Sequence, residues 1–352
     1  MSKLSRRDFL KLSGLALGGL AFSPFHAGRF DFEDANVVRV ATDSVSVYSQ
    51  PSDESNIIGT WYRDELINVY DEVRAEEPQH NPIWYRVWGG YMHRARLQRV
   101  KTLYNKPLDF IAEGTRRVVE ITVPFTQPWR LTKTYGWQAL FPLLYYESVY
   151  WVDAIEEGPD GEPWYRVVDD LTGNYLIAAK HVRPVPFSDL EPISPEIPFE
   201  SKRIEVNLTT QTLTAFEYDK AVFQTRVATG IIAGRTNPKE LSTKTPDGEF
   251  HIQSKTPSKH MGNGNLFAGV DDYELPGVPW TSFFTDVGHA FHGTYWHENY
   301  GVPMSHGCIN MRTSEAKWLF RWARPAYETV RMTDRSATPD VRGFGTLVKI
   351  FY

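Results

Sequence analysis

A single cysteine and three of the ten histidines lie in one short stretch, His292 to Asn310, which reads HGTYWHENYGVPMSHGCIN. Cys308 is the only cysteine of the chain, and His292 opens the stretch. A free thiol has a pKa of about 8.5 and is only a few per cent thiolate at neutral pH, so a cysteine nucleophile needs a nearby proton acceptor. The pattern predicts nucleophilic catalysis by Cys308 with His292 as its base.

The residues around the cysteine favour stabilisation of an oxyanion. In the run Ser305-His306-Gly307-Cys308, a glycine beside the nucleophile lets backbone N–H groups face a developing negative charge. We expect the amides of Gly307 and Cys308 to form this site. The segment TSEAKWLFRWA, Thr313 to Ala323, has a helical apolar pattern, with Thr313 as the expected cap. The dipole of that helix would add a modest favourable field.

Three other kinds of site fit the sequence less well. His289 and His292 are three residues apart on an expected strand, so their side chains point to opposite faces and make a poor start for a zinc site. The remaining candidate zinc ligands would be His297, Glu298 and His306. Pro303 occupies the first glycine position of a serine nucleophile elbow. In GNG at 262–264, Phe267 stands where a dinucleotide fingerprint needs its third glycine. We therefore expect no metal and no cofactor.

The elements that must position this site are mostly β-strands. Segments such as RIEVNLTTQTLTAFEYDKAVFQTRVATG and TPDGEFHI alternate apolar and polar residues, and GTLVKIFY closes the chain as a last strand. The sequence predicts a mostly-β catalytic domain over 202–352 with one helix after the cysteine. The stretch PVPFSDLEPISPEIP before it cannot sustain a helix or a central strand, which predicts a linker at 189–201. The linker implies that a chain starting near Glu200 has its own core and folds alone.

The region before the linker also alternates in short runs. The segment SVSVYSQPSDESNIIGTWYRDELINVYDEV resembles bacterial SH3-like domains, which are small β-barrels. The run WYRV at Trp84–Val87 recurs at Trp164–Val167, and ARLQRV is echoed by AKHVRPV. We therefore expect one SH3-like domain at 36–105 and a more divergent one at 112–188. Their aromatic residues are expected to be mainly core, and binding of cell-wall material is the weaker expectation.

The first thirty residues indicate export. SRRDFLK followed by the apolar run LSGLALGGLAF is too short to span a bilayer as a stable helix and resembles a twin-arginine signal. We expect a signal over 1–30 and a protein in the cell wall or periplasm. A lone cysteine rules out an intramolecular disulfide. The net charge of -5 gives no basic footprint for nucleic acid, and nothing later in the chain is apolar for long enough to cross a membrane. A monomer is expected.

Six pieces of the sequence together resemble one known family. They are VNLTTQTLTAFE, VATG, TPDGEF, PGVPW, FHGTYW and SHGCINM, in the order seen in the L,D-transpeptidase catalytic domain, also called the YkuD domain. The resemblance implies a β-sandwich and an exported enzyme that cross-links peptidoglycan stem peptides, donor and acceptor, through a cysteine thioester. It also implies that Gly293 orients His292 through its backbone carbonyl.

The resemblance further implies a set of substrate contacts. His306 would shape the loop or contact substrate beside Ser305, and Asn310 would lie next to the pocket. Met261 and Trp280 would be apolar contacts of a flap; simple packing is an equally good reading for both. Two alternatives stay open: an L,D-carboxypeptidase in which water resolves the thioester, and a wall-binding protein with an inactive catalytic domain. Carbapenem β-lactams should acylate the same sulfur.

Overall fold

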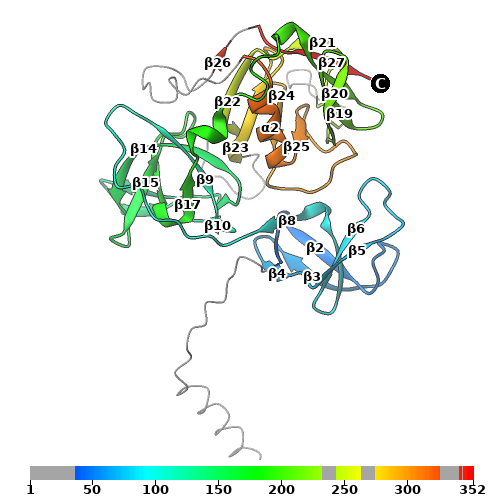
Figure 1. The fold of residues 1–352 in the computed structure, drawn as a ribbon. Helices are drawn as coiled ribbons and strands as arrows, with labels where there is room; N and C mark the ends of the chain where they lie inside the picture. Colours follow the sequence, from blue (N-terminus) through cyan, green and yellow to red (C-terminus); the bar gives the residue numbers. More distant parts are fainter. Residues whose placement is uncertain (1–35, 232–242, 263–273, 326–340, 343) are drawn as a thin grey trace, which may run out of the picture. The chain divides into compact units, whose positions relative to one another are not determined.

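The structure, a computed structural model, describes residues 36–231, 243–262, 274–325, 341–342 and 344–352. The predicted export signal at 1–30 and most of the predicted flap, including Phe267, lie outside these ranges. In the described part, strands dominate and the α-helix is α2 (Thr313–Trp322), as predicted (Figure 1). No helix in these ranges combines the length and apolar character that crossing a membrane requires.

Residues 37–100, here called the amino-terminal module, form two antiparallel sheets around one apolar core. The three-stranded sheet has the order β4-β1-β8 and the five-stranded sheet the order β3-β2-β7-β6-β5. The strands are β1 (Val37–Val40), β2 (Ser44–Tyr48), β3 (Ile57–Tyr62), β4 (Leu66–Asn68), β5 (Asp71–Arg74), β6 (Ile83–Val87), β7 (Gly90–His93) and β8 (Leu97–Val100). Val38, Val40 and Met92 are fully buried in this core. The SH3-like identity of the module stays a prediction.

Residues 117–184, here called the middle module, are built mainly on one sheet of seven strands. Its order is β12-β11-β16-β15-β14-β9-β17, with β10 and β13 paired separately. The strands are β9 (Arg117–Ile121), β10 (Phe125–Thr126), β11 (Trp129–Thr132), β12 (Gly136–Ala139), β13 (Leu144–Tyr145), β14 (Val149–Glu157), β15 (Pro163–Val167), β16 (Tyr175–Ala178) and β17 (Val182–Pro184). The predicted antiparallel strands are present here. Their order does not show the closed small barrel that was also predicted.

The repeat seen in the sequence has a structural counterpart. The two WYRV runs lie on β6 and β15, and in both the Trp-Tyr pair is buried while the arginine is less so. In both modules a short 3₁₀ helix, η2 (Arg94–Arg96) or η3 (Ala179–His181), then leads into the last strand. Consecutive buried Trp and Tyr side chains point to opposite faces of a strand, so each sheet is covered on both sides there. These aromatic residues are core, as expected.

The carboxyl-terminal domain has two five-stranded sheets that share one buried apolar cluster, an arrangement here called the sandwich. One sheet has the order β20-β19-β18-β27-β21 and the other β25-β24-β23-β22-β26. The strands are β18 (Lys202–Asn207), β19 (Thr212–Glu217), β20 (Lys220–Arg226), β21 (Gly248–His251), β22 (Ser254–Gly262), β23 (Glu274–Phe283), β24 (Ala290–Gly293), β25 (Ile309–Met311), β26 (Val341–Arg342) and β27 (Leu347–Phe351). The last strand, β27, lies inside its sheet, where it pairs in parallel with β18 and antiparallel with β21.

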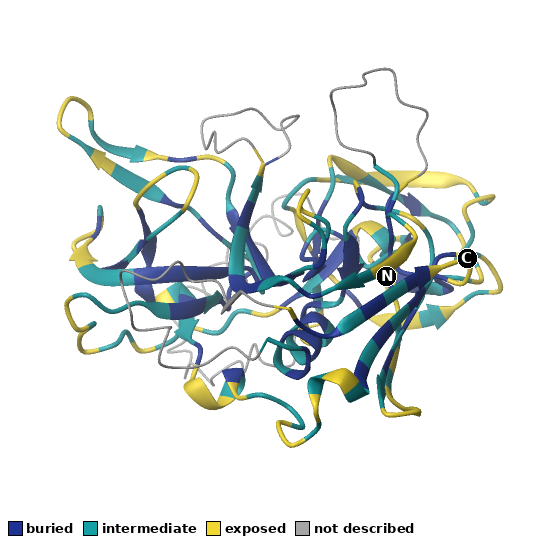
Figure 2. Ribbon diagram, turned by 90° about the horizontal axis from the view of Figure 1, so that it is seen from above, coloured by how far each residue is buried: buried dark blue, intermediate teal, exposed yellow. Residues whose placement is uncertain are grey.

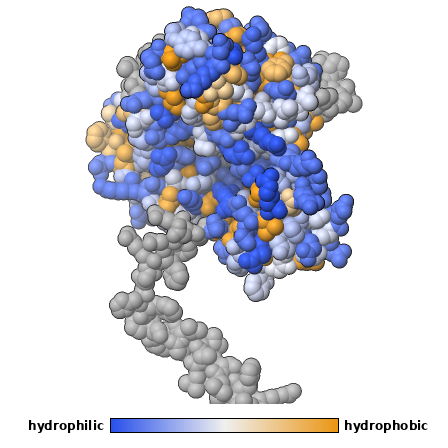
Figure 3. Space-filling view, turned by 45° about the vertical axis from the view of Figure 1, so that its right-hand side comes forward, coloured by the Kyte–Doolittle hydropathy of each residue, from blue (hydrophilic) through white to orange (hydrophobic). Residues whose placement is uncertain are grey.

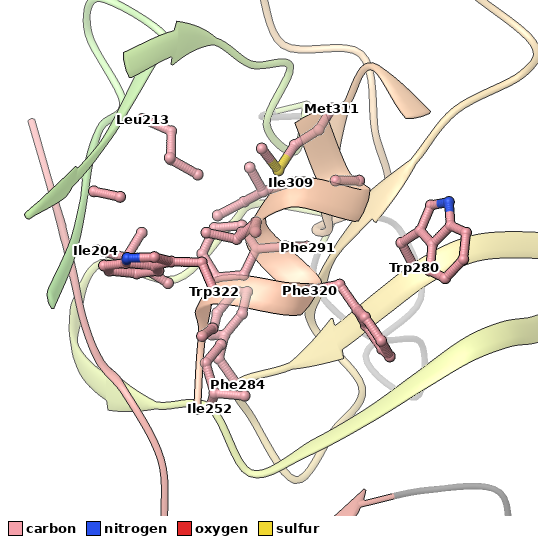
Figure 4. Packing of buried hydrophobic residues seen from close by; sticks show 14 of the residues in the cluster. Ile204, Leu213, Ile252, Trp280, Phe284, Phe291, Ile309, Met311, Phe320 and Trp322 are labelled. Carbon is pink, nitrogen blue, oxygen red and sulfur yellow. The ribbon is translucent and has the colours of Figure 1, made fainter. Parts of the chain in front are cut away.

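Helix α2 buries its apolar side in this domain. Ala316, Leu319 and Phe320 are buried, as their helical spacing predicted, and Phe320 lies near Phe291 and Ile309 in the core (Figure 4). The predicted cap is wrong: Arg312 is the N-cap residue, and Thr313 is the first residue inside the helix. Arg312 makes no side-chain capping bond.

Two buried lysines hold the other end of the helix. Lys202 Nζ donates to the carbonyl of Trp322 at 3.1 Å, and Lys255 Nζ donates to the carbonyl of Ala323 at 2.7 Å. The last carbonyls of a helix lack partners within it and carry partial negative charge, so cations are favourable there. Burial lowers the pKa of Lys202 to about 8. The lysines join α2 to β18 of one sheet and to β22 of the other.

The middle module shares its core with the carboxyl-terminal domain. Val118, Val149 and Trp151 belong to the same buried cluster as the sandwich residues, and so does Leu190 of the Pro-rich segment. The Tyr150 hydroxyl donates to the carbonyl of Pro276 at 3.1 Å. Figure 2 shows buried strands inside the molecule and exposed residues mainly at the turns. The core of the domain after the linker is therefore completed by residues that precede this domain.

The Pro-rich segment is docked on the domain that follows it. It contains two short 3₁₀ helices, η4 (Phe187–Leu190) and η5 (Phe199–Ser201). Arg321 of α2 donates to the carbonyl of Glu191 at 2.8 Å, and Lys317 pairs with Asp189 at 2.7 Å. Prolines exclude regular structure here without making the segment a free spacer. The face of the molecule seen in Figure 3 is mainly polar, with apolar residues in small groups.

Candidate active site

Strands β24 and β25 place the predicted base next to the cysteine segment. They run in parallel, and His292 pairs with Asn310 in their register. Cys308 directly precedes β25. Neighbouring strands lie about 4.8 Å apart, so the register brings His292 and the cysteine to the same end of this sheet. Parallel strands need a crossover connection, and residues 294–308 provide it. We call these residues the catalytic crossover.

The ring of His292 is held in one tautomer. Its Nδ1 lies 3.0 Å from the carbonyl oxygen of Gly293. A carbonyl oxygen can only accept, so Nδ1 carries the proton and Nε2 is left with a lone pair. The side chain is 2% exposed, and burial lowers its pKa to about 4. At neutral pH, His292 is a neutral imidazole able to take a proton at Nε2.

The Cys308 thiol is half-buried and protonated in the resting protein. Its Sγ lies 3.8 Å from the carbonyl oxygen of Gly288. Burial raises the pKa of this thiol to about 11. In the described part of the chain, none of the hydrogen bonds joins Sγ to His292. The resting pair is therefore a neutral thiol and a neutral imidazole, and proton transfer has to accompany attack.

Ser305 and Gly307 shape the turn before the cysteine. Ser305 Oγ accepts from the Gly307 amide at 3.1 Å and donates to the carbonyl of Cys308. Gly307 has φ 118°, a conformation that favours glycine. Its amide is thus already paired, which leaves the Cys308 amide as the better candidate for an oxyanion donor. Ser305 is only 5% exposed, so its observed contacts are those of a turn-forming residue.

Two segments that sequence reasoning left without a role brace this turn. Thr245 Oγ1 donates to the carbonyl of Gly307 at 2.9 Å and accepts from the amide of Gly230 at 2.8 Å. A Cβ added at Gly230 would lie 2.8 Å from Gly307 Cα, so no other residue fits there without movement. These residues belong to the motifs VATG and TPDGEF, which carried the resemblance. The sequence signal that could have identified Gly230 and Thr245 is the fixed order of these motifs along the chain.

Asn310 is buried beside His292 and contacts a second histidine. Its side-chain nitrogen lies 2.9 Å from His297 Nε2, and His297 Nδ1 accepts from the Asn299 amide at 3.1 Å. Since Nδ1 accepts, the proton of neutral His297 is on Nε2, and the Asn310 oxygen must be the atom that faces it. Burial lowers the pKa of His297 to about 3, which keeps the ring neutral. The Asn310 NH₂ group then points to the opposite side, where it has no hydrogen-bond partner among the described residues.

The comparison with protein families agrees with this geometry. The YkuD family, described as the L,D-transpeptidase catalytic domain, matches residues 201–348. These residues are a YkuD-type L,D-transpeptidase catalytic domain. The protein YqjB of Bacillus subtilis (strain 168), a relative of this chain, has been assigned as an L,D-transpeptidase. It is 34% identical over 94 residues, which are 26% of this chain and 52% of the relative. The chain thus spans about half the length of that relative.

Solved structures of L,D-transpeptidases are also similar. The enzyme from Xylanimonas cellulosilytica DSM 15894 is 20% identical, with a TM-score of 0.30 over 44% of this chain and 61% of that one. The catalytic domain from E. faecium is 25% identical, with a TM-score of 0.28 over 43% of this chain and 98% of that one.

The other predicted site residues of the L,D-transpeptidase domain are not all near its surface. Trp280 is 1% exposed and packs edge-on against Phe320 with ring centroids 5.5 Å apart, so it is a core residue in this state. Met261 is half-buried near the end of β22, and His306 is exposed. Within the described ranges, no group of three His, Cys, Asp or Glu side chains is arranged to hold a metal ion.

Alkylation of the resting thiol should depend steeply on pH. The pKa of Cys308 is raised to about 11 and that of His292 is lowered to about 4, so both groups stay neutral across the range between. We expect the rate of iodoacetamide alkylation, followed by intact mass, to rise about tenfold per pH unit from pH 7 to 10. A plateau beginning below pH 8 would instead indicate a preformed thiolate–imidazolium pair.

Proposed function

We propose that this protein is an active cysteine L,D-transpeptidase that cross-links peptidoglycan stem peptides and releases D-alanine. The observation that carries the proposal is the His292 ring, whose Nδ1–H bond to Gly293 leaves Nε2 as a base on the strand beside the Cys308 segment. The domain belongs to a family that acts on peptidoglycan. The proposal needs no cofactor.

In the acylation step, the Cys308 proton passes to His292 Nε2 as sulfur attacks the carbonyl that joins the third-position diamino acid to D-alanine. The Cys308 amide is the proposed donor to the oxyanion, since the amide of its neighbour Gly307 is already paired with Ser305. The carbon–nitrogen bond then breaks, and the imidazolium returns its proton to the leaving amine. D-alanine departs and a thioester remains.

In the second step, an amine from a neighbouring stem attacks the thioester and loses a proton to His292. Collapse of the tetrahedral intermediate expels the Cys308 sulfur, which recovers the proton from the imidazolium. The product is a link between two third-position residues, and the enzyme returns to its neutral resting pair. Water in place of the amine would give the L,D-carboxypeptidase reaction with the same residues.

The reaction is tested by mass spectrometry of the purified full chain with a disaccharide tetrapeptide. We expect a cross-linked dimer whose mass is the sum of two substrates minus one D-alanine. Accumulation of the tripeptide without dimer would assign a carboxypeptidase. No change in substrate, together with retained binding to cell-wall sacculi, would contradict enzymatic activity and leave a wall-binding protein.

The place of action belongs to the same proposal. A cell-wall substrate requires export, and the twin-arginine pattern in SRRDFLK supports an exported protein in the wall or periplasm. A fusion of residues 1–30 to a reporter that is active only after twin-arginine export should be exported. Replacement of both Arg6 and Arg7 by lysine should retain the reporter inside the cell.

A further inference from the structure

The amino-terminal module contacts the catalytic crossover directly. Asn81 Nδ2 donates to the carbonyl of Glu298 at 2.9 Å and to Asn299 Oδ1 at 3.1 Å. The Glu298 amide donates to the carbonyl of Ala95 at 2.9 Å. Arg39 donates to the carbonyl of Tyr295 at 3.2 Å. Residues far apart in sequence therefore hold the backbone that leads away from His292.

The side chains that the amino-terminal module contributes to these contacts are buried, which distinguishes them from surface side chains. Asn81 is 0% exposed and Arg39 is 1% exposed. A buried polar group that loses its partner keeps the cost of having left water, so such contacts are expensive to break. Within the described amino-terminal module, Asn81 Oδ1 accepts a hydrogen bond from Arg94 Nε, and the Asn81 side chain donates none. Both recorded bonds donated by its amide nitrogen go to the crossover.

The crossover passes this restraint on to the active site. The Asn299 amide donates to His297 Nδ1 at 3.1 Å, which fixes the ring beside Asn310. Asn310 in turn pairs with His292 in the strand register, two residues after the nucleophile. A continuous series of hydrogen bonds thus runs from Asn81 through Asn299 and His297 to Asn310, the strand partner of the base; Asn81, His297 and Asn310 are buried and Asn299 is half-buried.

We propose that Asn81 is a positioning residue for the His292–Cys308 site, and that the amino-terminal module thereby completes the active site rather than only binding wall material. The inference concerns how the site proposed above is built, so it rests on that function. Asn81 touches neither reacting group. Its effect is to hold the crossover, and with it His297 and Asn310, in one conformation.

The sharpest test replaces Asn81 with aspartate in the full chain. Asn81→Asp keeps the oxygen that accepts from Arg94 but removes both donors and sets a carboxylate against two oxygens of the crossover. We expect the limiting rate of carbapenem acylation to fall roughly 10- to 100-fold, the loss expected for a broken buried hydrogen bond. The dependence of the acylation rate on carbapenem concentration should change little, because Asn81 does not contact the ligand.

A matched control lies in the same module. Asp43→Asn removes an ion pair with Arg63 that does not touch the crossover, and it should leave acylation unchanged. Asn299→Ala tests the contact from the other side. If the two residues act together, the Asn81→Asp, Asn299→Ala double variant should be no slower than the slower single variant. Thermal unfolding shows which variants remain folded at the assay temperature.

The pH profile of Cys308 alkylation separates this inference from the proposed function. Alkylation needs no transpeptidase activity, so a profile moved by Asn81→Asp but not by Asp43→Asn supports positioning even if no cross-linked product forms. A wild-type protein that never reacts with stem peptides would defeat the proposed function alone. The inference is overturned if a folded Asn81→Asp variant is acylated at the wild-type rate and has the wild-type pH profile of alkylation. It is also overturned if Asp43→Asn loses as much acylation rate as Asn81→Asp.

Discussion

Cys308→Ala is expected to remove carbapenem adduct formation and cross-linking altogether, because one sulfur carries both reactions. Loss of a nucleophile typically costs far more than about 1,000-fold in rate. The fold should survive, since the half-buried thiol contributes little to the core and its recorded contact is a weak one, 3.8 Å from the Gly288 carbonyl oxygen. Intact mass after incubation with a carbapenem measures the effect.

The control for this variant is Cys308→Ser, which keeps a polar group of similar size. Serine is a poorer nucleophile without a strong base, so it should also fail to accumulate adduct while unfolding at nearly the same temperature as wild type. An adduct that persists in Cys308→Ala and maps to another residue would show that a different group is the nucleophile.

A chain that begins at Glu200 is expected to lose its cooperative fold. The truncation removes Val118, Val149, Trp151, Val185 and Leu190, which belong to the buried cluster of the sandwich. Each large buried apolar side chain contributes about 1.5–3 kcal/mol. Together the five match the roughly 5–15 kcal/mol that stabilises an ordinary domain. Urea denaturation should show a broad or absent transition.

The shape of the interface supports the same expectation. Gly277 of β23 has φ 70°, and a Cβ there would lie 2.4 Å from the ring of Tyr150 in β14. The backbone of the catalytic domain is thus shaped to receive the middle module. The matched control is a chain that begins at Thr102, which keeps the shared core but lacks Asn81. It should unfold cooperatively yet acylate slowly. A Glu200 chain as stable as the full protein would refute the shared core.

Much of the catalytic domain could be predicted from short stretches of sequence. Period-two alternation in VNLTTQTLTAFE and GTLVKIFY marks strands because alternate side chains face the core. The spacing of Ala316, Leu319 and Phe320 marks the buried side of α2. Cys308 and His292 could be nominated because few residue types supply a nucleophile and a base near neutral pH.

Other assignments failed where packing competes with local pattern. For Trp280, flap contact and simple packing were equally good readings, and the structure shows packing in the core, because its strand is covered by α2. Thr313 resembled a cap, yet the helix begins at that residue and is preceded by Arg312. The Pro-rich segment resembled a free linker but docks through Leu190 and Glu191. In each case the residue type allowed both outcomes.

The sequence by itself indicated which residues could do chemistry, and the tertiary structure decided how those residues are held. Reactive residue types and strand periodicity are local properties, so they can be read along the chain. The pairing of His292 with Asn310 and the bond from Asn81 to Glu298 join residues that only the folded chain brings together. A hydrogen bond between distant residues leaves no periodicity in either segment, because it depends on one donor and one acceptor meeting in space.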